Sequence, residues 1–177
     1  MTTPEFSRTE RVDTIGEAPR TVHIAAEPGE RAALAERFAL IAIEELRADF
    51  TVQRDEIGIV TRGRIIAHVT QPCVVTGEPV PARIDESVAL RFVDDDDEPA
   101  RDEIELTADA LDIIPYENGE IDLGEAAAET MALALEPFPR SADAEATLRA
   151  SGVLQEDQVG PFSALAALKA KLGGSPS

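Results

Sequence analysis

The stretch from Val80 to Phe92 constrains the fold more than any other part of this sequence. Its apolar residues lie on even positions: Val80, Ala82, Ile84, Val88, Leu90 and Phe92. Polar or charged residues occupy most of the odd positions between them. Because side chains alternate across a β-strand, this pattern predicts a strand with one buried face and one solvent-facing side. Glu86 interrupts the apolar face, and we interpret it as the mark of a β-bulge or of strong twist.

Two upstream segments, residues 45–53 and 57–69, alternate with the same period of two. Together with residues 80–92 they predict an antiparallel meander of three long strands within 45–93. Gly63 lies in the apolar row of the middle strand, where it allows a bend. Weaker strand candidates at residues 6–15 and 20–25, and short apolar pieces between 104 and 121, add to the sheet.

Helical spacing predicts three helices. Pro28 suits the first turn of a helix over residues 28–39, because its missing N–H has no partner there. Asp122 and Glu125 have the spacing of a capping box at the start of a helix over 122–135. Residues 161–172 form a short last helix that ends before a glycine pair.

These elements predict an α+β fold. We expect an antiparallel sheet that can curl into a partly closed barrel, with two main helices packed on it and a short C-terminal helix. Residues 1–140 form a single domain in this interpretation. Residues 141–160 are expected to be a mobile linker, because they show little periodicity, and residues 161–172 form the separate helix.

The acidic charge is concentrated in one segment. The chain has a formal net charge of −19, and residues 94–129 alone carry −14. Such a balance repels nucleic acid and anionic membranes and suits either a basic protein partner or no partner at all. The candidate partner-binding acids are Asp94, Asp95, Asp96, Asp97, Glu98, Asp102 and Glu103. The simpler interpretation of this run is a solvated loop, and the loop pattern that binds calcium is absent from it.

No motif for catalysis is present. Cys73 is the only cysteine, so a disulfide within the chain is impossible, and two histidines, His23 and His68, do not complete a closed zinc site. A buried structural cysteine is a simpler interpretation than a nucleophile, because no third group accompanies Cys73 and His68. We therefore expect no enzymatic activity, no metal and no cofactor. The N-terminus has no apolar core and no segment is long enough to span a membrane, which predicts a cytoplasmic protein.

Several motifs, in their order and spacing, resemble the YceD family of bacterial proteins, and look most like an alphaproteobacterial branch. They include a turn with Cys73, Thr76, Glu78 and Pro79, and a helix start with Asp122, Leu123, Gly124 and Glu125. The segments Leu133–Arg140 and Pro161–Leu165 also match.

The resemblance implies a role in accumulation of the large-subunit ribosomal RNA, with no enzymatic activity. The family's gene often lies beside that of a small basic ribosomal protein of the large subunit. Many members carry a second cysteine three residues after the first and another pair later, which suggests a metal knuckle. Here Thr76 takes the second position and no later cysteine exists, so the metal role does not carry over.

Two hypotheses follow for function. The first is a non-enzymatic ribosome-biogenesis factor that acts through a basic ribosomal protein, with indirect or weak RNA contact. Arg62, Arg64 and Arg83 are then the plausible phosphate contacts. The second is an acidic binding module or chaperone for a basic protein unrelated to ribosome assembly. An enzyme with an unrecognised pair of acids is a third interpretation that no motif supports.

Overall fold

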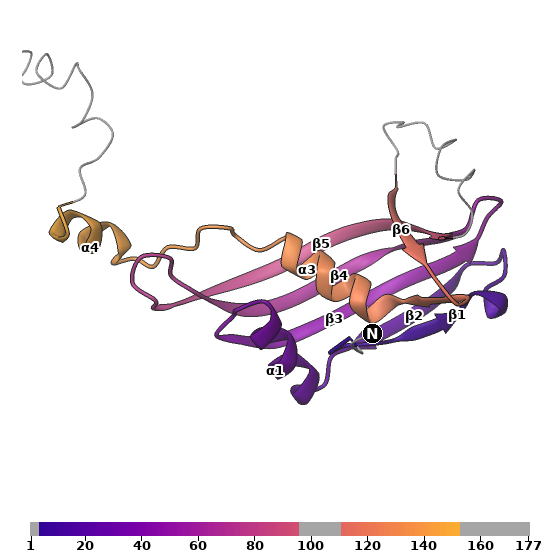
Figure 1. Ribbon diagram of the computed structural model, residues 1–177, viewed down its shortest axis with the longest axis horizontal. Helices are drawn as coiled ribbons and strands as arrows, with labels where there is room; N and C mark the ends of the chain where they lie inside the picture. The colour runs from indigo at the N-terminus through magenta and orange to yellow at the C-terminus, as the bar shows by residue number, and fades with distance from the viewer. Residues whose placement is uncertain (1–3, 96–110, 153–177) are drawn as a thin grey trace, which may run out of the picture.

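The fold is built on a five-stranded sheet (Figure 1). The structure, a computed structural model, describes residues 4–95 and 111–152. The strands of the sheet are β2 (Arg20–Ala25), β3 (Ala42–Arg54), β4 (Ile59–Pro72), β5 (Pro79–Asp94) and β6 (Asp112–Tyr116), in the order β2-β3-β4-β5-β6. The meander of three long antiparallel strands is confirmed, since β3, β4 and β5 pair successively along most of their length.

The alternation in sequence corresponds to two different faces. The inner face of the three long strands is almost fully buried, with Leu46, Phe50, Val52, Ile65, Ala67, Val69, Ile84, Leu90 and Phe92 in one core. The outer face carries exposed charged residues such as Asp49, Arg62, Arg64 and Arg83. One face therefore supplies the apolar burial that stabilises the fold, and the other is available to solvent.

The two predicted main helices are confirmed. Helix α1 (Pro28–Arg37) has proline in its first turn and a capping box formed by Glu27 and Glu30. Helix α3 (Leu123–Leu133) lies across the inner face of the sheet (Figure 1). Both contribute to the same core, through Leu34 of α1 and Leu123 and Met131 of α3, each fully buried.

The N-terminal segment does not join the main sheet. The strand predicted over residues 6–15 is confirmed only for β1 (Thr9–Arg11), and a 3-10 helix, η1 (Val12–Thr14), follows it. β1 pairs with β7 (Glu120–Asp122) in a separate two-stranded sheet. The two residues of the turn between β6 and β7, Asn118 and Gly119, both have positive φ, as their sequence predicts.

Three features of the sheet differ from the expectations. β6 runs parallel to β5 rather than antiparallel, which requires a long crossover, and the residues between Asp94 and Asp112 provide its length. The described sheet is open, with β2 and β6 at its edges, so it is not a closed barrel. β4 and β5 stay in register through Glu86, so the bulge expected there is wrong; the register shift lies between Ile43 and Glu45 of β3.

The region after α3 contains one more helix. α4 (Ala144–Ala150) lies within residues 141–160, the segment that the sequence predicts to be a mobile linker. The helix predicted over 161–172 lies outside the described residues. None of the helices that the structure describes is long and apolar enough to cross a membrane.

Candidate functional site

The predicted acidic candidates begin where β5 leaves the sheet. Asp94 is the last residue of β5, and the backbone N–H of Asp95 donates to the carbonyl oxygen of Tyr116 at 3.0 Å. These two acids therefore lie beside the end of β6. Asp96, Asp97, Glu98, Asp102 and Glu103 lie outside the described residues.

Three further acids of the same segment are exposed. They are Asp112 on β6, Glu117 in the β6–β7 turn and Glu129 on α3, and together with Asp94 and Asp95 they are called the acidic surface below. Within residues 4–95 and 111–152, none of these three carboxylates forms an ion pair. These three acids are not among the candidates predicted from the sequence, although they belong to the segment with a net charge of −14. They differ from Asp122 and Glu125, whose carboxylates have partners within the fold.

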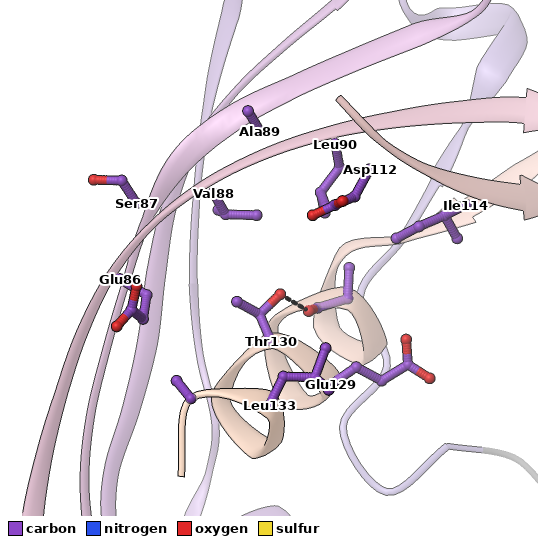
Figure 2. A pocket seen from close by; sticks show the side chains of 12 residues that line it. Glu86, Ser87, Val88, Ala89, Leu90, Asp112, Ile114, Glu129, Thr130 and Leu133 are labelled. Atoms are coloured by element: carbon purple, nitrogen blue, oxygen red, sulfur yellow. Dashed lines mark hydrogen bonds between the residues drawn. The ribbon is translucent and has the colours of Figure 1, made fainter. Parts of the chain in front are cut away.

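A groove of about 510 Å³ lies between β5 and α3, within this acidic surface (Figure 2). Val88 and Leu90 of β5 point toward α3, whereas Ser87 points away from it (Figure 2). Leu133, at the end of α3, is 88% exposed on the same groove. The charged residues that line it are Glu86, Asp112 and Glu129, all of them acidic. The groove thus has an apolar floor and a negatively charged rim.

The predicted phosphate contacts gather on the opposite, outer face of the sheet. Arg62 and Arg64 project from β4 and Arg83 from β5, and all three are exposed. Asp85 accepts hydrogen bonds from Arg64 and lies 3.8 Å from Arg83. The hydrogen bonds from Arg64 lower the pKa of Asp85, so this carboxylate stays charged and competes with phosphate for both arginines. Of the three, only Arg62 has no carboxylate partner among the described residues.

The Asp122 motif connects the N-terminal segment to α3. The carboxylate of Asp122 accepts hydrogen bonds from Ser7 Oγ (2.6 Å), the N–H of Arg8 (2.8 Å) and the N–H groups of Gly124 and Glu125. The Glu125 carboxylate forms a bidentate ion pair with Arg37 of α1, at 2.6 and 2.9 Å. These residues therefore stabilise the packing of helices and N-terminus rather than form a binding site.

The comparison with protein families agrees with the resemblance seen in the sequence. The family model described as large ribosomal RNA subunit accumulation protein YceD matches residues 61–169, well over half of the chain. The chain belongs to the YceD family. A search of curated proteins and a search of solved structures each gave no match.

Membership of the YceD family implies a role in accumulation of the large-subunit ribosomal RNA, and the family's description names no chemical reaction. The YceD match begins within β4 and includes β5, the acidic surface, the groove and α3. The alphaproteobacterial branch stays a prediction, because the match does not distinguish branches.

The Cys73 turn is held by hydrogen bonds within the protein. The N–H of Cys73 donates to the carbonyl oxygen of Glu78 (2.8 Å), and the N–H of Val74 donates to that of Pro139 (2.9 Å). The Sγ of buried Cys73 accepts from the N–H of Ser141 at 3.3 Å. The hydroxyl oxygens of Thr76 and Ser141 are 3.2 Å apart. The segment after α3 thus packs directly on the turn.

The same contacts predict a pH dependence of stability. Desolvation raises the pKa of Cys73, but hydrogen bonds from Thr76 and Ser141 outweigh it and lower the pKa from its usual 9.0 to about 6. When the pKa of a group is lower in the folded state than in the unfolded state, the group stabilises the folded state increasingly as the pH rises from the folded-state pKa to the unfolded-state pKa. The free energy of unfolding of the wild type, relative to Cys73→Ala, should therefore increase from pH 6 to pH 9.

Urea denaturation of both proteins at several pH values within this window measures the difference. A difference that is constant across the window would show that the thiolate is not stabilised by the turn. Thr76→Val serves as a second variant, because it removes a hydroxyl that lowers the pKa of Cys73 and should reduce the pH dependence.

Proposed function

We propose that this YceD-family chain supports accumulation of the large-subunit ribosomal RNA as a non-enzymatic factor that binds a basic protein on its acidic surface. The observation that carries the proposal is the set of exposed carboxylates at Asp112, Glu117 and Glu129, none of which has an ion-pair partner among the described residues. Carboxylates that no described residue neutralises attract a cationic partner and repel phosphate. This role is carried out in the cytoplasm, where ribosomal subunits assemble.

RNA contact is indirect or weak in this proposal. Asp85 holds Arg64 and lies near Arg83, which leaves Arg62 as the arginine of this set most available to phosphate. Because each phosphate contact contributes about one unit to the salt dependence of RNA affinity, a shallow salt dependence is expected. The basic protein then mediates the effect on ribosomal RNA.

Deleting the gene and complementing it with variants tests the proposal. We expect the deletion to lower the ratio of large-subunit to small-subunit ribosomal RNA, as measured by sedimentation profiles and RNA quantitation. The wild-type gene should restore the ratio. A variant with Asp112→Asn, Glu117→Gln and Glu129→Gln should not, because it removes three carboxylates of the acidic surface without altering any described ion pair.

The matched control changes the net charge equally at other exposed acids, with Glu17→Gln, Glu36→Gln and Glu56→Gln. This control should restore the ratio as well as the wild type does. An unchanged ratio after gene deletion would contradict the proposed role. An unchanged ratio together with a basic partner that is retained at low salt and released at high salt would favour the alternative, an acidic chaperone unrelated to ribosome assembly.

A further inference from the structure

β5 has an open edge beside the groove. β4 pairs with β5 over its whole length, whereas β6 pairs with β5 only from Leu90 to Asp94. No described strand covers this edge before Leu90. At its start, Pro79 and Pro81 protect the edge, because a proline nitrogen cannot donate to an added strand.

The backbone groups that point to the open edge can be assigned. The N–H of Asp95 donates to Tyr116 on the β6 side, so odd-numbered residues of β5 direct their backbone groups to that side. Backbone groups alternate along a strand, which assigns the same direction to the N–H and C=O groups of Arg83, Asp85, Ser87 and Ala89. The even-numbered residues between them direct their backbone groups to β4, because in the same register the N–H of Cys73 donates to the carbonyl oxygen of Glu78, another even-numbered position. Four consecutive odd positions therefore have no strand partner among the described residues and can pair with an added strand.

The side chains beside this edge indicate the chemistry of that strand. Along the inner face of β5, Glu86 is followed by Val88, and Asp112 and Glu129 complete the rim of the groove. A strand placed here would direct alternate side chains into the groove. An aliphatic residue fits opposite Val88 and the exposed Leu133, and basic residues fit two positions before and after it.

We propose that the edge of β5 from Arg83 to Ala89 binds an extended segment of the basic partner as an additional β-strand. The inward residues of this segment are basic, aliphatic and basic, two positions apart. The inference rests on the proposed function, because the basic protein supplies the segment. A second copy of this chain fits poorly, since pairing two such edges would bring the acidic rims together.

Amide hydrogen exchange of the full chain, followed by NMR, tests the edge directly. The probe is a blocked peptide of sequence Thr-Lys-Thr-Val-Thr-Lys-Thr, and its control replaces each lysine with glutamate. At about 0.02 M salt, surface charges are weakly screened and the basic peptide should bind. When the peptide is present at about ten times its Kd, exchange at Arg83, Asp85, Ser87 and Ala89 should slow about tenfold. The amides of Ile84, Glu86 and Val88, already paired with β4, should not change.

Ser87→Pro is the decisive variant. Residue 87, like Pro79 and Pro81, is an odd-numbered position of β5, and the N–H at these positions points away from β4. A proline there removes no hydrogen bond to β4, so the sheet should be retained. Its affinity for the basic peptide should fall about tenfold relative to Ser87→Ala, which keeps the N–H. Should Ser87→Pro fail to fold, the exchange measurement on the wild type decides alone.

Three results would overturn the inference. The first is protection of the four odd-numbered amides in the free chain, which would show that residues of the chain itself fill the edge. The second is binding of the basic peptide without protection of these amides. The third is equal binding, or no binding, of the basic and acidic peptides. None of these results depends on the ribosomal RNA ratio, so a failure of edge binding is distinguishable from a failure of the proposed function.

Discussion

Replacing Gly63 with alanine should destabilise the protein by about 3 kcal/mol or more, the upper end of the cost of overpacking a core. Gly63 lies in the middle of β4, opposite Phe50 of β3 and Val88 of β5. A Cβ atom there would clash with the carbonyl oxygen of Asp49 and would lie 2.8 Å from Phe50 Cδ1. The closest of these atoms belongs to the backbone of β3, which is paired with β4. The clash can therefore be removed only by separating β3 from β4.

The measurement is urea denaturation with Gly29→Ala as the matched control. Gly29 lies in α1, and an added Cβ would meet no atom within 4 Å. This control should be neutral or stabilise the protein by up to about 1 kcal/mol, because alanine favours helix more than glycine does. If Gly63→Ala and the wild type unfold at the same urea concentration, β3 does not lie too close to position 63 to accommodate a Cβ atom, and the prediction is wrong.

Replacing Asp122 with alanine should cost about 3 kcal/mol, from the loss of a helix cap and of two charge-assisted hydrogen bonds to the N-terminal segment. The carboxylate binds four donors, two in the first turn of α3 and two at Ser7 and Arg8. Its loss also releases the segment that carries Phe6, which is fully buried in the core. The effect should therefore appear at the N-terminus as well as in α3.

Two comparisons separate these contributions. Ser7→Ala removes a single hydrogen bond to Asp122 and should cost about 1 kcal/mol. Asp112→Ala removes an exposed carboxylate without an ion pair and should change stability by less than about 0.5 kcal/mol. Equal stability of Asp122→Ala and Asp112→Ala would mean that the cap does not hold the N-terminus.

Local patterns in the sequence predict the central part of the fold. The alternation at residues 80–92 predicts β5, and Pro28 together with the helical spacing after it predicts α1. A period of two determines which side chains share a face, so the placement of Arg62, Arg64 and Arg83 on the outer face also follows from the sequence. Strand direction does not follow from such a pattern. The parallel pairing of β6 with β5 depends on the path of the connection between them, and no residue of β6 indicates it.

The candidate site was harder to predict, because its geometry depends on contacts between distant residues. The net charge of residues 94–129 indicates an acidic surface. The net charge does not show that Asp122 and Glu125 bind partners within the fold, whereas Asp112 and Glu129 line the groove. Cys73 likewise meets Ser141, a contact 68 residues apart that no local motif shows. Glu86 suggested that β5 is irregular at this position. In the structure β5 stays in register with β4 there, and Glu86 lies at the rim of the groove.

The pairing of β1 with β7 also affects the order in which the protein can fold during synthesis. β2 to β5 follow one another in the chain and can pair as soon as about half of the sequence has been made. β1 is synthesised before any of them, but its partner, β7, is more than a hundred residues away. Phe6 cannot reach its buried position until Gly124 and its neighbours have left the ribosome. Phe6 and β1 are therefore synthesised before the strands of the sheet but protected after them, and a nascent chain halted before Asp122 would expose this segment to proteases.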